Sequence, residues 1–248
     1  MLRSLLCSAA LACAVAGPAA ALDLAQMTDA EREAFRAEVR AYLFDNPEVI
    51  YEAVAVLEQR QAELQAANDV DLVAENADAL FNDGHSFVGG NPEGDITIVE
   101  FFDYRCGYCH KAFPEVNELV ESDGNIRFIV KELPILGDSS VLASRFAIAT
   151  QQVAGDEAYK QVHDALMTMK GDVSDVTLRR LGESFGLDTD AIMAHMDSDD
   201  VTAVIDANRA LAARLDISGT PSFVMGDQMI RGYVPLEGMQ QIVAEERS

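Results

Sequence analysis

The segment of the chain best suited to chemistry is Cys106-Gly107-Tyr108-Cys109-His110, two cysteines separated by two residues with a histidine directly behind them. This spacing is compatible with a reversible dithiol/disulfide pair, with half of a zinc site, and with the attachment point of a c-type haem. A zinc site needs two further cysteine or histidine ligands at a matched spacing, whereas the other histidines are scattered singly along the chain. A dithiol is therefore the preferred interpretation, and a c-type haem protein is the alternative.

The residues around the cysteines predict a strand on one side and a helix on the other. Residues 96–102 are nearly continuously apolar and β-branched, which is typical of a strand buried on both faces. Residues 112–120 predict a helix, so Cys106 is expected where a strand ends and a helix opens. The N–H groups and macrodipole of a helix start stabilise a thiolate, which lowers a cysteine pKa from about 8.5 to roughly 3.5–7.5. Cys109 follows one turn later on the same face, so we expect Cys106 to attack and Cys109 to resolve.

The rest of the pattern predicts a mixed sheet interrupted by helices. Residues 126–133 form a second buried strand, and the order strand, helix, strand indicates a parallel βαβ unit. Residues 89–92, Gly-Gly-Asn-Pro, are interpreted as a turn before the first strand. Two short strands around residues 226–227 indicate a hairpin, and a last helix follows them. The sequence therefore predicts an α/β fold, a mixed β-sheet with a large helical insertion at about residues 138–215.

The first 21 residues have the features of a secretory signal peptide. Arg3 supplies the positive charge, residues 5–15 form a short apolar core, and a run of alanines ends at Ala21, after which cleavage is expected. Cys7 and Cys13 lie in the segment that is removed, so the exported chain keeps two cysteines. We therefore expect a periplasmic protein.

Residues 22–80 are expected to form an N-terminal helical extension, and residues 81–248 a catalytic domain. The extension carries a stripe of residues at a 4-3-4-3 spacing: Ile50, Val54, Leu57, Gln61 and Leu64. That spacing matches the a and d positions of a coiled coil, with one polar residue as a candidate for setting the register. The extension is therefore either an oligomerisation stem or a helix packed against its own catalytic domain.

The formal net charge of −24 limits the possible partners. Such an acidic surface repels phosphate backbones and anionic lipids, so neither nucleic-acid binding nor a role at a membrane surface is expected. No organic cofactor and no metal are expected. Met193, His195 and Met196 lie within one helical turn and have the donor types that suit Cu(I). Their spacing also fits an amphipathic helix that buries the two methionines, and this interpretation is preferred.

Two separate segments together resemble a known family. The stretches VEFFDYRCGYCHKAFPE and ISGTPSFVMGDQMIRGYVP are similar to the DsbA-type branch of the thioredoxin superfamily, and within it to exported ScsC-like proteins (suppressor of copper sensitivity C). The resemblance covers about residues 81–248 and is specific because two remote motifs agree. It implies a thioredoxin fold.

The resemblance also implies roles for residues outside the dithiol. Thr220-Pro221 is expected to form a cis peptide beside the cysteines, with the Thr220 backbone able to pair with a substrate peptide. Glu100 matches a buried acid beneath the disulfide, and Lys131 matches its basic partner. Such a pair would pass protons to Cys109 during exchange.

The residues between the cysteines bear on the direction of the reaction. Gly107-Tyr108 stand between the cysteines, as in the isomerase DsbC, where DsbA has a histidine, and Thr220 before the proline also matches DsbC. A disulfide isomerase or reductase for exported proteins, kept reduced by a membrane thiol reductase, is therefore preferred. A disulfide oxidase with a membrane oxidase partner and a copper-binding or holdase protein are the alternatives. In ScsC-like relatives the N-terminal extension builds trimers, so a homo-trimer is expected.

Overall fold

The structure is a computed structural model that describes residues 26–248, so the expected signal peptide lies outside the described residues. The chain divides into two compact units, Met1–Gln59 and Arg60–Ser248. Among the described helices, none is long and apolar enough to cross a membrane.

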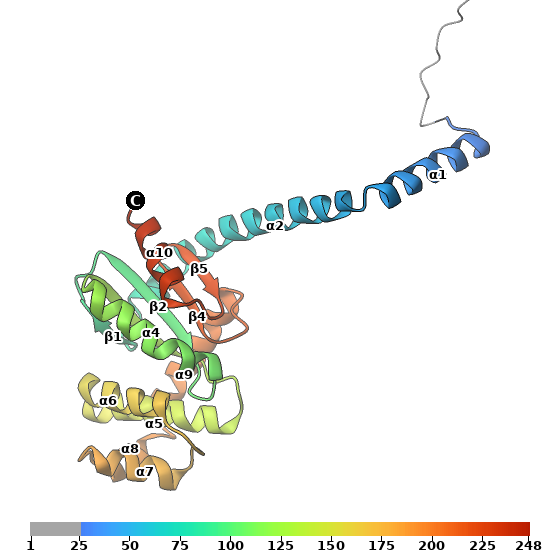
Figure 1. The fold of residues 1–248 in the computed structure, drawn as a ribbon. Helices are drawn as coiled ribbons and strands as arrows, with labels where there is room; N and C mark the ends of the chain where they lie inside the picture. Colours follow the sequence, from blue (N-terminus) through green and yellow to red (C-terminus); the bar gives the residue numbers. More distant parts are fainter. Residues whose placement is uncertain (1–25) are drawn as a thin grey trace, which may run out of the picture. The chain divides into compact units, whose positions relative to one another are not determined.

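The described part of the first unit consists of helix α1 (Asp29–Asp45) and the beginning of helix α2 (Glu48–Glu75) (Figure 1). Helix α1 starts with a capping box, in which the Thr28 hydroxyl accepts from the Glu31 N–H and the Glu31 carboxylate accepts from the Thr28 N–H. No residue of α1 is buried, although its sequence includes several large apolar side chains. The helix therefore has an apolar face on which nothing packs among residues 26–248.

The second unit is built on one five-stranded mixed sheet with the strand order β1-β3-β2-β4-β5. The strands are β1 (Phe87–Gly90), β2 (Ile96–Phe102), β3 (Ile126–Glu132), β4 (Ser222–Met225) and β5 (Gln228–Arg231). Strands β2 and β3 are parallel, and the other three pairings are antiparallel. This arrangement confirms the predicted α/β class, the βαβ unit and the C-terminal hairpin.

Strand β1 is an edge strand that the sequence did not predict, because two of its four residues are glycines in a segment interpreted as a turn. Gly90 has φ +67° and lies against β3, where an added Cβ would approach the carbonyl oxygen of Ile126 to 2.4 Å. Only glycine fits this position without strain. The glycine thus allows close approach of two strands.

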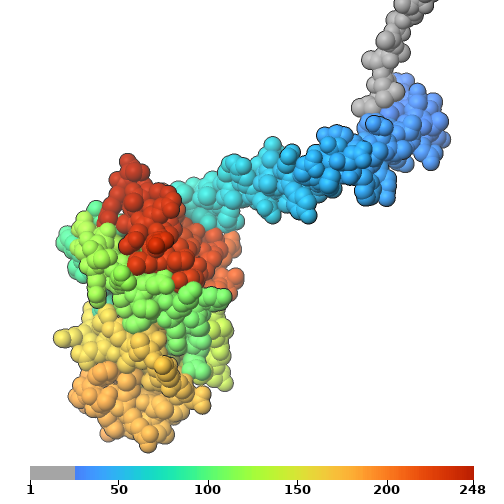
Figure 2. All heavy atoms as spheres, viewed as in Figure 1, coloured from blue at the N-terminus to red at the C-terminus, as the bar shows by residue number. Residues whose placement is uncertain are grey.

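Helices cover both faces of the sheet. Those of the second unit that follow α2 are α3 (Ala77–Phe81), α4 (Gly107–Asp123), α5 (Asp138–Ala154), α6 (Asp156–Thr168), α7 (Asp175–Ser184), α8 (Thr189–His195), α9 (Asp199–Arg214) and α10 (Leu236–Glu246). Helices α5–α9 form the expected helical insertion, which Figure 2 shows in yellow to orange, packed against the sheet portion. Helices α4 and α10 lie on one face of the sheet with the larger apolar core.

A second apolar core lies on the opposite face of the sheet. It contains Val73 from the end of α2 and Leu80 from α3, packed with Leu211 and Leu215 from the α9 region against Phe101. The end of α2 is therefore part of the compact second unit, which begins at Arg60. The predicted boundary near residue 80, between the N-terminal extension and the catalytic domain, remains a prediction.

Candidate active site

Cys106 lies between the end of strand β2 and the first residue of helix α4. It is the N-cap residue, with extended φ −79° and ψ 116°, and its sulfur accepts a hydrogen bond from the Cys109 N–H at 3.4 Å. Its thiol donates to the carbonyl oxygen of Thr220 at 3.1 Å. Both cysteines are free thiols. The first-turn N–H groups of a helix have no partners within the helix, so they stabilise negative charge on the Cys106 sulfur.

The two residues between the cysteines are exposed, whereas Cys109 is completely buried. Burial raises the pKa of the Cys109 thiol strongly, a hydrogen bond from the Asp103 backbone opposes this, and the nearby carboxylate of Glu100 raises the pKa further. Cys109 is therefore a protonated thiol in this environment, and it must transfer its proton to a nearby group before it can react.

Glu100, from the middle of strand β2, is the acidic group close to Cys109. Its side chain is buried, and one carboxylate oxygen has no hydrogen-bond partner among the described residues. Burial raises the pKa of Glu100 to about 8. Glu100 lines a cavity together with Phe113 and His163. The volume of this cavity, about 10 Å³, is close to the minimum for one water molecule. The sequence-based prediction of a buried acid at Glu100 matches this burial.

The predicted pairing of Lys131 with Glu100 is wrong. In the parallel β2–β3 pair Glu100 lies opposite Val130 and Lys131 lies opposite Phe101. Because successive residues of a strand point to opposite faces, Glu100 and Lys131 point to opposite faces of the sheet. The ammonium group of Lys131 instead donates to the Asp83 carboxylate and, at 3.1 Å, to a neighbouring serine hydroxyl.

Asp83 is therefore the ionic partner of Lys131. Its partial burial acts to raise the pKa of this carboxyl, but hydrogen bonds from Lys131 and Ser86 outweigh that effect and lower the pKa to about 2. The pair lies on the face of the sheet opposite to the cysteines. Lys131 thus forms a structural ion pair on the face of the sheet away from the dithiol.

Thr220 and Pro221 are placed next to Cys106, as predicted. The Thr220-Pro221 peptide bond is cis, and the Thr220 carbonyl oxygen accepts the Cys106 thiol hydrogen bond. The Pro221 carbonyl oxygen accepts from the Gly232 N–H at 3.0 Å, which joins this loop to the segment after β5. Two segments more than a hundred residues apart thus meet at the Cys106 sulfur.

Asp103 is a residue of the site that the sequence analysis missed. It is fully buried, and its carboxylate accepts three backbone hydrogen bonds, from Arg105 at 2.7 Å, Ile135 at 2.8 Å and Leu136 at 3.0 Å. Its carbonyl oxygen accepts from the Cys106 N–H at 3.0 Å. Asp103 therefore ties the cysteine loop to the loop after β3. No local sequence pattern indicates this role, because two of the three bonded N–H groups come from a distant segment.

A buried polar network below the cysteine loop was also missed. The Tyr104 hydroxyl is 3.0 Å from Nδ1 of His163, and the Tyr159 hydroxyl donates to the Glu132 carboxylate at 2.5 Å. Burial raises the pKa of Glu132 to about 7 and lowers that of His163 to about 3. The network connects helix α6 to the end of β3 and to the segment before Cys106.

The methionine and histidine set considered for copper does not converge on one point. Met196 packs in the apolar core, Met193 packs against it, and His195 hydrogen-bonds the Gln152 side chain at 2.7 Å. The methionines thus serve as core residues of an amphipathic helix.

A thioredoxin-type sheet, with two cysteines at the start of the helix after its central strand and a cis-proline loop against the first cysteine, defines the class of thioredoxin-fold proteins. Residues 97–244 match the model of the DSBA-like thioredoxin domain, and residues 31–63 match that of the Copper resistance protein ScsC N-terminal domain. The first match covers more than half of the chain. The chain therefore belongs to the DSBA-like thioredoxin family, with an N-terminal domain of the ScsC type.

Solved structures support the same assignment. A thioredoxin-like oxidoreductase from Silicibacter pomeroyi is 44% identical, with a TM-score of 0.64 over 68% of this chain and 96% of that one. ScsC from Proteus mirabilis in a transitional conformation is 29% identical, with a TM-score of 0.65 over 90% of this chain and 98% of that one.

Curated relatives include much longer proteins. The Na(+)/H(+) antiporter NhaA 1 of Salinispora arenicola is 32% identical over 157 residues, which are 63% of this chain and 24% of the antiporter. The chain thus spans about a quarter of the length of these first relatives.

Proposed function

We propose that this protein exchanges disulfides with exported proteins in the periplasm, using Cys106 and Cys109 as a redox-active pair. The observation that carries the proposal is the position of the Cys106 sulfur, at the N-cap of α4 and 3.1 Å from the Thr220 carbonyl oxygen. The N–H groups of a helix start favour an attacking sulfur, and a substrate peptide can pair with an extended backbone segment beside it. The Cys106 sulfur lies next to both the start of α4 and the Thr220 backbone.

The proposed reaction begins with Cys106. Its thiolate attacks one sulfur of a substrate disulfide, the substrate S–S bond breaks, and the second substrate sulfur leaves as a thiolate that takes up a proton. A mixed disulfide between Cys106 and the substrate results. In isomerisation the freed substrate thiolate, or another one, attacks this mixed disulfide and releases Cys106, so the enzyme undergoes no net oxidation.

Cys109 has the resolving role when isomerisation stalls. Its sulfur attacks the sulfur of Cys106, the mixed disulfide breaks, and the substrate leaves reduced while the enzyme becomes oxidised. Because the Cys109 thiol is buried and its pKa is raised, it needs a base within the protein. Glu100 in its ionised form is the proposed base, because its charge already acts on the Cys109 thiol. A membrane thiol reductase would then return the pair to the dithiol form.

The preference for isomerase or reductase over oxidase depends on the residues between the cysteines. Gly107 and Tyr108 provide no imidazolium to stabilise the Cys106 thiolate, which weakens oxidase character. The test is refolding of scrambled, disulfide-bonded RNase, run beside oxidation of the fully reduced RNase. We expect recovery of RNase activity from the scrambled form, and a faster gain from the reduced form would favour the oxidase.

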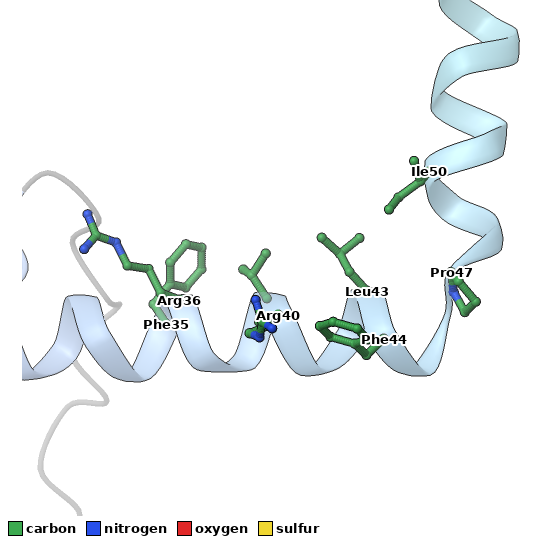
Figure 3. A pocket seen from close by; sticks show the side chains of 8 residues that line it. Phe35, Arg36, Arg40, Leu43, Phe44, Pro47 and Ile50 are labelled. Atoms are coloured by element: carbon green, nitrogen blue, oxygen red, sulfur yellow. The ribbon is translucent and has the colours of Figure 1, made fainter.

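We also propose that the N-terminal unit assembles three copies of the chain. Phe35, Val39, Leu43 and Phe44 of α1, with Ile50 of α2, line a groove of about 510 Å³. Figure 3 shows Phe35, Leu43 and Ile50 on the inner side of the bend between the two helices. Apolar surface of this extent, open to solvent, is typical of an interface, and this unit matches the ScsC N-terminal domain.

Three catalytic sites on a shared stem would hold a misfolded substrate while Cys106 attacks it. Light scattering should give the mass of three chains for the intact protein. A negative charge introduced into the groove by Phe35→Asp should dissociate the trimer, whereas Glu33→Gln on the same exposed helix should leave the trimer intact. A monomeric parent protein would contradict the proposed assembly and would leave the dithiol chemistry untouched.

A further inference from the structure

Two tyrosine rings from distant parts of the chain form a surface beside Cys106. Tyr108, between the cysteines, has 63% of its surface exposed, and its ring stacks on Tyr233 with 6.2 Å between centroids and 29° between planes. The ammonium group of Lys111 lies 4.1 Å from the centroid of the Tyr233 ring. Tyr108 and Lys111 are one helical turn apart on α4, so they share a face of that helix. We call the paired rings of Tyr108 and Tyr233 the aromatic ledge.

The Tyr233 ring is held in place from both sides. Its hydroxyl donates to the two carboxylate oxygens of Glu115 at 2.8 and 3.0 Å, and the Leu236 N–H donates to the same carboxylate at 2.9 Å. The residue before it, Gly232, is hydrogen-bonded to the Pro221 carbonyl oxygen. Tyr233 is thus fixed between helix α4 and the cis-proline loop, the two elements that contact Cys106.

We propose that the aromatic ledge is a specificity subsite for an apolar or aromatic side chain next to the substrate cysteine. The proposal rests on the proposed disulfide exchange, because the substrate must be joined covalently to Cys106. That bond fixes where the flanking residues of the substrate lie. An extended peptide rises about 3.3 Å per residue, so a side chain one or two positions from the joined cysteine reaches the residues that border Cys106.

The chemistry of the ledge selects for apolar contact. The exposed ring of Tyr108 offers a flat apolar surface, and rings prefer offset or edge contacts with other rings. Because Tyr233 is already fixed, little conformational freedom is lost when a substrate side chain covers the pair. Partial burial of a phenylalanine on two rings corresponds to about a tenfold preference over glycine. A protein that corrects misfolded chains would thereby select cysteines that lie in exposed apolar segments.

The test measures selectivity with two peptides that differ at one position. Each has the form Ac-Gly-X-Cys-Gly-amide, with X phenylalanine or glycine and with the cysteine activated as a mixed disulfide with thionitrobenzoate. Cys109→Ser protein, which cannot resolve the product, is mixed with each peptide, and release of the coloured thiol gives the second-order rate of capture by Cys106. We expect the phenylalanine peptide to react about tenfold faster than the glycine peptide.

A second substitution in the Cys109→Ser protein separates the effect of the aromatic ledge on selectivity from any effect on the general reactivity of Cys106. Tyr233→Ala and Tyr108→Ala should each reduce the ratio of the two rates to about two or less, whereas the matched control Phe185→Ala, an exposed aromatic of the helical insertion, should retain it. Because Tyr108 is exposed, its replacement tests the ledge even where Tyr233→Ala fails to fold. A ratio near one in the parent, or a ratio unchanged by both substitutions, would overturn the ledge. No capture of either peptide would contradict the disulfide exchange itself.

Discussion

Replacing Glu100 by glutamine should remove a pH dependence of stability that the buried acid imposes. Burial raises the pKa of Glu100 to about 8, against 4.5 for an exposed glutamate. Between these pH values the unfolded chain has lost the proton while the folded chain retains it, so the folded state binds more protons and the free energy of unfolding falls as pH rises. This fall in the free energy of unfolding begins near pH 4.5, is complete above about pH 8, and amounts to roughly 4–5 kcal/mol.

The assay is urea unfolding of the reduced protein at pH 5, 7 and 9. Glutamine has nearly the same shape and no charge, so Glu100→Gln should match the parent to within about 1 kcal/mol at pH 5. At pH 9 it should be more stable than the parent by several kcal/mol. Glu118→Gln, an exposed position on α4, serves as the control and should follow the parent at every pH. Parallel pH profiles for the parent and Glu100→Gln would refute the assignment of a buried, protonated acid.

Three further substitutions test other parts of the structure. Cys106→Ser should abolish insulin reduction, because Cys109 is buried, and activity above background would exclude Cys106 as the attacking residue. Asp103→Ala leaves three backbone N–H groups without their acceptor, so urea unfolding should show that the free energy of unfolding falls by about 2–4 kcal/mol. A fall below about 1 kcal/mol would show that water replaces the carboxylate. Arg231→Ala removes both hydrogen bonds to the buried Asp69 and should cost about 1–3 kcal/mol in the same assay, and an unchanged midpoint would count against this contact between α2 and the hairpin.

The parts of the fold that the sequence predicted are those with strong local signals. Strand β2 is a continuous apolar run, the hairpin has Gly226-Asp227 at its turn, and the helical insertion has three glycines that separate its helices. Strand β1 was missed because glycines have no side chain to show a strand pattern, and Gly90 is required by contact with another strand. That requirement is a tertiary property, which the local sequence does not display.

The candidate site was predictable only where a motif marks it. The cysteines and Thr220-Pro221 belong to motifs, and the structure brings them together. The partner of Glu100 was predicted wrongly because a strand's register cannot be derived from its composition, and a shift of one residue moves a side chain to the other face. Asp103 was missed because its three bonded N–H groups belong partly to a loop thirty residues further on.

The central claim, that Cys106 is the sulfur which attacks substrates, is tested most directly by mapping the mixed disulfide. Cys109→Ser protein is incubated with scrambled RNase, quenched with acid, digested without reductant and analysed by mass spectrometry. The account predicts a peptide in which Cys106 is joined to an RNase cysteine, and no such adduct when Cys106→Ser protein is treated in the same way. The claim would be contradicted by an RNase adduct through Cys109 in the Cys106→Ser protein together with no adduct through Cys106 in the Cys109→Ser protein.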